Sequence, residues 1–168
     1  MTQPTEGARR DDGPMSPTSH WSRSPAATGR DGHGLGVLDE ETCLRLLGEQ
    51  HVGRLGFSAG SLPVIHPVNY VLSGRSILFG SEAGEKLRAA EQHAVACLQI
   101  DHHDAFEHSG WSVLATGRLR VLPAGEVPVA PGAHGPAPWA LRADHLVELS
   151  AEILSGRVIG GLQRGRDA

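Results

Sequence analysis

The sequence contains little cysteine and no long hydrophobic run. Its two cysteines, Cys43 and Cys97, are too few for a disulfide framework and lack the Cys-x-x-Cys spacing of a metal or redox pair, so we expect two small buried thiols. The longest apolar run, residues 94–98, is far shorter than the roughly 20 residues of a membrane span. The N-terminus also lacks a signal-peptide stretch. These absences predict a cytoplasmic protein without a membrane partner.

Lysine is almost absent as well. Of the 15 basic residues, Lys86 alone is lysine and the others are arginine, while the formal net charge is −4. No basic run exceeds Arg9-Arg10, which argues against a nucleic-acid or anionic-membrane partner. No spacing of Ser, Cys, His and Asp indicates nucleophilic hydrolysis, so no catalytic side chain is predicted.

Composition divides the chain into a tail, a domain and a second tail. Residues 1–34 are rich in Gly, Pro, Ser and Thr and nearly free of aliphatic side chains, so they cannot bury enough surface to offset their chain entropy. We expect a disordered N-terminal tail at 1–34, one folded domain at 35–162 and a C-terminal tail at 163–168. The 168 residues, 39% hydrophobic, provide enough apolar material for one compact domain.

Hydrophobic periodicity predicts a mainly β domain with two short helices. Asp39 is a candidate N-cap of a helix that ends near Gly48, and residues 84–92 combine good helix formers with one apolar face. Strands are expected at 52–57, 62–72, 76–79, 94–100, 111–122, 145–149 and 157–159. Pro63 and Pro67 cannot donate to a ladder, which favours a sheet edge, a bulge or the start of strand pairing at those points. Consecutive strands with two helices indicate an antiparallel barrel or sandwich.

The segment from Phe79 to Leu87 is the first candidate site. It places Ser81, Gly84 and Lys86 where a strand is expected to run into a helix N-terminus. Free backbone N–H groups and the helix dipole favour an anion there, and a hydroxyl and an ammonium add a donor and a charge. Phosphate is therefore the expected ligand, although the Walker A spacing is absent. The alternative is a solvated lysine on an exposed helical turn.

Three other segments carry polar side chains that could serve a site. Asn69 and Tyr70, in residues 66–70, need hydrogen-bond partners if they are buried, and either a planar heterocycle or neighbouring backbone could provide them. Trp111 heads residues 110–117, where packing is the alternative to a cofactor contact. Residues 101–108 hold three His and three acidic residues, but all in one expected loop. Because metal ligands usually come from separate elements, we predict no metal site.

Four segments together carry a family resemblance. They are residues 52–57 (Val-Gly-Arg-Leu-Gly-Phe), 63–70 (Pro-Val-Ile-His-Pro-Val-Asn-Tyr), 77–87 with Ser81, Gly84, Lys86 and Leu87, and 110–117 (Gly-Trp-Ser-Val-Leu-Ala-Thr-Gly). In this order they are similar to the pyridoxamine 5′-phosphate oxidase-like family, and the chain resembles a small actinobacterial-type member. The similarity runs from Leu38 to Val121 and resumes at Trp139 and at 155–159, so it covers essentially the whole expected domain.

The resemblance implies an FMN-binding split β-barrel that works as a homodimer, with FMN at the subunit interface. It matches the family's phosphate contacts to Ser81, Gly84 and Lys86, and the ring contacts to residues 67–70 with a second contribution from 111–112. The cofactor-binding residues that we expect are Pro67, Val68, Asn69, Tyr70, Phe79, Gly80, Ser81, Gly84, Lys86, Leu87, Trp111 and Ser112. Flavin chemistry needs an oriented ring and no dedicated catalytic side chain. We therefore expect an FMN-dependent oxidoreductase acting on a small-molecule substrate or electron donor.

The chain also departs from the family pattern. Gly80 stands where members often have Arg or another polar residue, and Ser81 where they often have Thr, which removes a potential phosphate or ring contact. The C-terminal Arg and His that grip the substrate of true pyridoxamine 5′-phosphate oxidases have no counterpart, which argues against vitamin B6 oxidation. The alternatives are the deazaflavin F420 on the same barrel, or a non-catalytic flavin- or haem-binding protein. The longer anionic tail of F420 would require basic residues such as Arg54, Arg75 or Arg88 along one groove.

Overall fold

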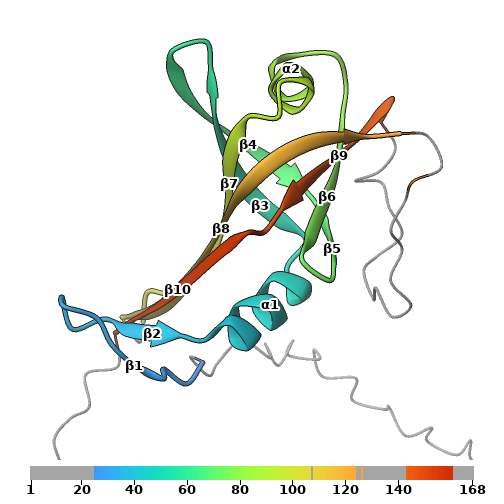
Figure 1. Ribbon diagram of the computed structural model, residues 1–168. Helices are drawn as coiled ribbons and strands as arrows, with labels where there is room; N and C mark the ends of the chain where they lie inside the picture. Colours follow the sequence, from blue (N-terminus) through green and yellow to red (C-terminus); the bar gives the residue numbers. More distant parts are fainter. Residues whose placement is uncertain (1–24, 107, 124–125, 127–142, 161–168) are drawn as a thin grey trace, which may run out of the picture.

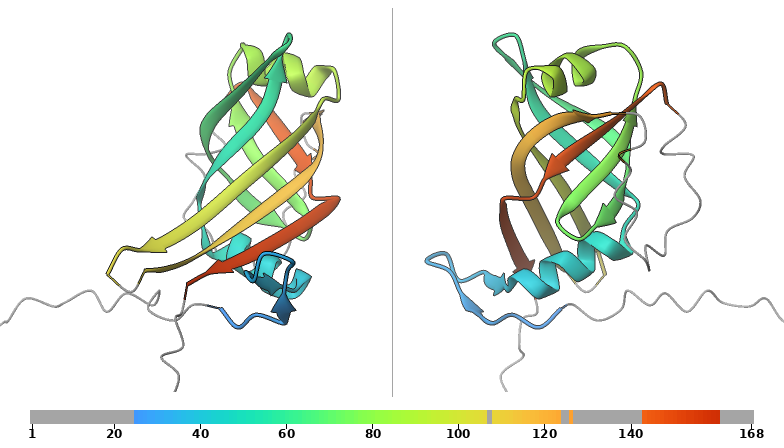
Figure 2. Two further views of the ribbon diagram at one scale, coloured as in Figure 1. Left: turned by 90° about the vertical axis from the view of Figure 1, so that its left-hand side faces the viewer. Right: turned by 45° about the vertical axis from the view of Figure 1, so that its right-hand side comes forward.

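The strands of the protein curl into a barrel that is open along one side, with one helix at each end. The computed structural model describes residues 25–106, 108–123, 126 and 143–160. Within these residues ten strands form one antiparallel sheet system, and α1 and α2 lie at opposite ends of the barrel (Figure 1, Figure 2). The mainly β, antiparallel split-barrel fold expected from the sequence is confirmed. Neither helix in this part of the chain has the length and apolar character needed to cross a membrane.

The elements follow the expected order along the chain. They are β1 (Gly29–Arg30), β2 (Gly36–Leu38), α1 (Glu40–Glu49), β3 (Val52–Ala59), β4 (Leu62–Asn69), β5 (Val71–Ser73), β6 (Ser76–Ser81), α2 (Glu85–Glu91), β7 (Val95–Asp104), β8 (Ser109–Leu122), β9 (His145–Ser150) and β10 (Ile153–Ile159). Both expected helices are present. The segment expected as one strand at 62–72 is divided into β4 and β5 at Tyr70.

The barrel is open between β4 and β6. Strands pair in the order β1-β2-β10-β8-β7-β3-β4, while β9 pairs with β8 and β6, and β6 pairs with β5. β4 therefore ends the main path, and no ladder among the described residues joins it to β6. Pro63 and Pro67 lie in β4, where an edge tolerates missing N–H donors, so the expected sheet edge is confirmed.

β8 is the strand that joins the two parts of the barrel. Its residues 110–116 pair with β10, and its residues 119–122 pair with β9. Between them lies Gly117, where a Cβ would stand 1.6 Å from the carbonyl oxygen of Ser150. Glycine is required here because the backbone between β9 and β10 passes directly over β8.

α1 covers one end of the barrel with a short apolar face. The expected N-cap is confirmed, since Asp39 Oδ1 accepts a hydrogen bond from the Thr42 N–H at 2.8 Å. Cys43, Leu46 and Leu47 are buried on the face that packs against β5, β8 and β10. The barrel interior is filled by alternate residues of the strands, including Leu55, Phe57, Ile77, Phe79, Leu98, Val113, Leu119, Val147 and Leu149.

Ordered structure begins before the domain boundary that we expected at residue 35. β1 and β2 form a hairpin that continues the sheet at β10, and the Thr28 N–H donates to the Val37 carbonyl oxygen at 2.8 Å. Residues 25–34 are therefore part of the folded domain. The rest of the expected N-terminal tail, residues 1–24, and the expected C-terminal tail lie outside the described residues.

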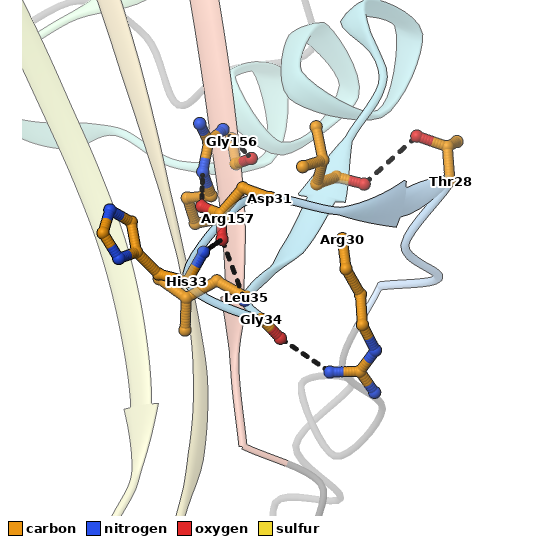
Figure 3. Close-up of polar contacts among 9 residues, drawn as sticks. Thr28, Arg30, Asp31, His33, Gly34, Leu35, Gly156 and Arg157 are labelled. Carbon is orange, nitrogen blue, oxygen red and sulfur yellow. Dashed lines mark hydrogen bonds and ion pairs between the residues drawn. The ribbon is translucent and has the colours of Figure 1, made fainter.

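The carboxylate of Asp31 holds this hairpin together and ties it to the barrel. Oδ1 accepts hydrogen bonds from the N–H groups of His33 at 2.9 Å and Leu35 at 3.0 Å, and Oδ2 accepts one from Arg157 Nε at 2.9 Å (Figure 3). Arg157 belongs to β10, far from Asp31 in the sequence. Composition around residue 31 could not indicate this contact, because the partner is remote along the chain.

Three details of β7 and β10 also differ from the expectation. Residues 101–104 lie in β7 and not in a loop, because they pair with residues 109–112 of β8. β10 begins at Ile153, earlier than the expected start at residue 157, because its first residues pair with Thr116 and its neighbours. Cys43 is buried as expected, but Cys97 is only half-buried.

Candidate functional site

A cavity of about 430 Å³ lies at the opening between β4 and β6. Residues 66–69 of β4 form one wall, and Gly80 and Ser81 at the end of β6 form another. The connection to α2 and the first turn of that helix, residues 82–86, line it further, and Ala143 completes it. The volume falls within the range of about 300 to 1,000 Å³ that is typical of small-molecule sites.

Seven of the expected cofactor-binding residues meet in this cavity. They are Pro67, Val68, Asn69, Gly80, Ser81, Gly84 and Lys86. In the sequence they fall into two separate candidate segments, 66–70 and 79–87. The open edge of β4 and the end of β6 bring these segments together, so the two candidates form one site.

Three other expected contacts have their side chains in the protein interior. Phe79 and Leu87 are buried, and neither lines the cavity. Tyr70 is also buried, and its hydroxyl donates to the Leu47 carbonyl oxygen at 2.8 Å. Burial raises the pKa of the Tyr70 hydroxyl well above its ordinary value. The ring of Tyr70 therefore packs beneath α1, and its hydroxyl is already paired.

Trp111 and Ser112 lie away from the cavity. Both are on β8, which β7 and β3 separate from β4. Trp111 is buried, and its ring lies beside that of His102 with the centroids 6.2 Å apart. Ser112 is half-buried in register with Asp101 and Arg157. Within one chain these two residues do not share a cavity with residues 67–69.

Five residues of the cavity were missing from the expected set. They are His66, Glu82, Ala83, Glu85 and Ala143. Strand alternation could have indicated His66, because it lies two residues from Val68 on β4 and therefore on the same face of the strand. In the structure the His66 ring meets the Phe57 ring edge-on, with the ring centroids 5.5 Å apart. Glu82, Ala83 and Glu85 lie within the candidate segment 79–87, but they were not among the residues expected to contact the phosphate. Ala143 had no sequence signal.

The first turn of α2 offers donors to an anion. The half-buried Lys86 has no ion-pair partner among the described residues. The N-cap of α2 is Gly84, which has no side-chain acceptor, so the N–H groups of the first turn remain without a side-chain cap. Ser81 is buried, and its hydroxyl donates to the Glu82 carbonyl oxygen at 3.0 Å.

These donors fit the phosphate end of a flavin. A phosphate needs a cation and N–H donors, which Lys86 and the α2 first turn supply at one side of the cavity. Glu82 and Glu85 are exposed at the same rim, where their carboxylates can accept hydrogen bonds from hydroxyl groups such as those of a ribityl chain. The Ser81 hydroxyl is not a free donor to a phosphate, because it already donates to the Glu82 carbonyl oxygen.

The arginines that could serve a longer anionic tail do not lie along one groove. Arg54 forms an ion pair with Asp101, and Arg75 forms one with Glu40 and also donates to the Ala151 carbonyl oxygen. Arg88, on α2, lines a smaller cavity of about 220 Å³. Two of the three arginines that the F420 alternative would draw on are therefore engaged in ion pairs.

The histidine-rich segment forms no metal cluster in the part of the chain that the structure describes. No group of three or more His, Cys, Asp or Glu side chains there is arranged to hold a metal ion. Residues 101–104 instead take part in the β7–β8 ladder.

Comparison with known families agrees with this architecture. A sequence model of the family described as pyridoxamine 5′-phosphate oxidase matches residues 39–158, from the N-cap of α1 into β10. The chain belongs to this family. The matched range contains every residue that lines the cavity, so the cavity lies within the family's shared domain.

Individual relatives of the family were found in mycobacteria. The chain is similar to the uncharacterized protein Rv0080 of Mycobacterium tuberculosis, with 30% identity over 125 residues, covering 71% of this chain and 82% of that protein. Among solved structures it is similar to the FAD binding protein from Mycobacterium smegmatis, with a TM-score of 0.58 and 28% identity, covering 74% of this chain and 99% of that one.

A more distant structure shows the same fold. The FAD and heme binding protein from Mycobacterium smegmatis matches with a TM-score of 0.57 and 19% identity, covering 73% of this chain and 72% of that one. Structures with this fold thus include two proteins described as binding FAD, one of them together with haem.

Proposed function

We propose that this member of the pyridoxamine 5′-phosphate oxidase family is a flavin-dependent oxidoreductase acting on a small-molecule substrate or electron donor. The observation that carries the proposal is the cavity in the barrel opening, where Lys86 and Gly84 meet residues 67–69 of β4. FMN is the flavin that the sequence resemblance implied. The similarity to an FAD binding protein adds FAD as a candidate.

Each wall of the cavity has a distinct task in this proposal. Lys86 and the first-turn N–H groups of α2 hold the flavin phosphate. The polar edge of the flavin ring lies along β4, where Asn69 supplies both a donor and an acceptor. Pro67, which is exposed on β4, gives the ring an apolar contact. The bound flavin supplies hydride transfer, so the chain itself needs to bind and orient the ring.

We also propose that two copies of the chain pair through the outer face of the sheet. A row of residues crosses five strands on this face, and it consists of Ile65, Gly56, Cys97, Thr116 and Ile153. Ile65 is 69% exposed and Ile153 is 65% exposed at the two ends of the row. Pro67 is exposed on β4 and also lines the cavity, so a second copy seated here would cover the flavin. A second copy would also bring its own β8 toward the site.

The oligomeric state can be measured directly. We expect size-exclusion chromatography with light scattering to report a dimer, and the double substitution Ile65→Asp with Ile153→Asp to give a monomer that binds flavin more weakly. Leu62→Asp is the matched control, because Leu62 is also 69% exposed but lies at the β3–β4 turn. A monomeric wild-type protein would contradict the proposed pairing.

The cofactor is tested by titration of the purified, flavin-free protein. We expect FMN or FAD to bind with a changed flavin absorption spectrum and quenched fluorescence, and F420 to bind more weakly because Arg54 and Arg75 are engaged elsewhere. Binding of F420 but neither flavin would favour the F420 alternative. A flavin that binds and is reduced by dithionite but by no nicotinamide donor would favour the non-catalytic alternative. Binding of none of the three would contradict the proposal.

A further inference from the structure

His66 brings an imidazole to the cavity of about 430 Å³. It is half-buried on β4, and strand alternation places it on the same face as Val64 and Val68, toward the barrel interior. Its ring rests edge-on against Phe57. Within the described ranges the imidazole makes no hydrogen bond or ion pair. Its ring nitrogens are therefore available to a ligand in the cavity.

The strand register places His66 on the side of the cavity nearer to α2. β5 pairs with β6 as far as Val71 opposite Leu78, and β4 has left β6 just before that pair. Counted back from Val71, Asn69 lies two residues into the opening and His66 lies five residues into it. Continued in the same register, His66 falls opposite Ala83, in the connection that leads into α2 (Figure 1).

The charged side chains of the cavity are unbalanced for a phosphate ligand. They are the ammonium of Lys86 and the carboxylates of Glu82 and Glu85. The interior-facing residues of β3 and β6 add no titratable group, and Arg54 lies on the opposite face of β3 in an ion pair. Arg88 makes no ion pair in the described part of the chain, but it lines the smaller cavity.

A phosphate in the cavity would thus meet one cation and two carboxylates. A phosphate monoester carries close to two negative charges at neutral pH. A second positive charge beside Lys86 would offset the carboxylates, and His66 is the one remaining titratable residue among those that line the cavity.

Histidine can gain this charge near neutral pH. An imidazole without a partner takes up its second proton at about pH 6.5. A neighbouring phosphate favours the protonated form, because opposite charges attract and both imidazolium N–H groups donate charge-assisted hydrogen bonds. A ligand that favours the protonated form takes up a proton when it binds above that pH, and its affinity falls as the pH rises.

We propose that His66 is protonated when flavin binds and holds the flavin phosphate together with Lys86, so that flavin affinity is controlled by pH. The inference rests on the proposed function, because the phosphate belongs to the flavin in the cavity. A lysine ammonium keeps its charge up to about pH 10 and so contributes across the neutral range. The contribution of His66 is present at about pH 6.5 and is lost as the pH rises toward about 8.5.

The first test compares FMN with riboflavin, which has the same ring and no phosphate, on the flavin-free, full-length protein. FAD replaces FMN if it binds more tightly. FMN affinity, measured by fluorescence titration, is expected to fall about tenfold from about pH 6.5 to about pH 8.5, and riboflavin affinity to change less than about twofold. A constant FMN affinity, or an equal fall for riboflavin, would overturn the inference and leave the proposed function intact. Binding of no flavin at any pH would contradict the proposed function.

The second test removes the proton site and keeps a polar side chain. His66→Gln can hydrogen-bond but cannot become charged. At about pH 6.5 it is expected to bind FMN about tenfold more weakly than the wild type, with no further fall at higher pH and with riboflavin binding retained as evidence of folding. His33→Gln is the matched control, because His33 is exposed at the β1–β2 turn and lines neither cavity. A His66→Gln variant that keeps the wild-type pH dependence would show that another group takes up the proton.

Calorimetry counts the proton directly. At about pH 7.5 the phosphate of FMN is already doubly ionised, since its second pKa is about 6. Titration of FMN into the wild type in two buffers with different ionisation enthalpies is expected to show net proton uptake, and His66→Gln is expected to show none. Binding of FMN to the wild type without proton uptake, or equal uptake by the variant, would contradict the role of His66.

Discussion

The hydroxyl of Tyr70 donates a hydrogen bond to the carbonyl oxygen of Leu47 at 2.8 Å. Leu47 lies in the last turn of α1, where backbone carbonyl groups lack helical partners. Tyr70 follows directly after β4, whose last residues line the cavity proposed to bind flavin. This contact therefore connects the end of the helix at one end of the barrel to the strand that forms one wall of the site.

Removal of this hydroxyl should affect stability and leave cofactor binding intact. Tyr70→Phe keeps the buried ring but leaves a carbonyl group of α1 without its donor, which costs about 1–3 kcal/mol of unfolding free energy. Denaturant unfolding measures that loss, and flavin titration of the folded variant should give the wild-type affinity. A loss of flavin affinity with unchanged stability would indicate that Tyr70 contacts the ring, as the resemblance implied.

Lys86 should matter to the cofactor and little to the fold. Lys86→Ala removes the ammonium beside the proposed phosphate, and we expect flavin affinity to fall by about 1–3 kcal/mol. The unfolding free energy should change by less than about 0.5 kcal/mol, because Lys86 has no ion-pair partner in the described part of the chain. Lys86→Arg should retain most of the affinity. Unchanged binding in the alanine variant would place the phosphate elsewhere.

Gly117 should tolerate no side chain. A Cβ at this position would stand 1.6 Å from the Ser150 carbonyl oxygen, so Gly117→Ala must push two backbone segments apart. We expect a loss of about 3 kcal/mol or more, measured as a lower midpoint of thermal or denaturant unfolding. Gly29→Ala is the control, since no atom lies within 4 Å of a Cβ there. Equal stability of the two variants would contradict the close crossing of β8.

The contacts of Asp31 should make the stability of the fold depend on pH. Burial raises the pKa of Asp31, but hydrogen bonds from the N–H groups of His33 and Leu35 and from Arg157 outweigh it, so the net pKa lies below its ordinary value. The pKa of Asp31 is lower in the folded protein than in the unfolded chain, where it is about 3.9. The ionised carboxylate therefore stabilises the fold at a pH above about 3.9, and this stabilisation is lost as the pH falls through the folded pKa.

Asp31→Asn tests this dependence. The variant should unfold at a lower temperature than the wild type at pH 6, and the difference should shrink as the pH is lowered below about 4. Asp144→Asn changes an exposed carboxylate and should show no such convergence. A constant difference between Asp31→Asn and wild type at every pH would mean that the ionised carboxylate is not what holds the hairpin.

Much of the fold could be predicted from local patterns. The alternation from Val52 onward, the N-cap at Asp39 and the prolines at an edge strand each depend on residues a few positions apart, and the structure confirms all three. The limits of the domain could not be found in this way. Residues 25–34 resemble a tail by composition, yet Arg157 supplies a partner for Asp31 from the other end of the chain.

For the candidate site, too, some features follow from local sequence and others only from the fold. The sequence by itself determined which residues were available, because Gly84 and Lys86 stand at the start of a helix whose pattern is local. Only the tertiary structure decided that β4 and β6 open beside them, that Tyr70 turns toward α1, and that Arg88 stays free while Arg54 and Arg75 do not. Strand alternation assigns residues to two faces, but contacts between remote strands determine which face meets a cavity, a helix or a charged partner.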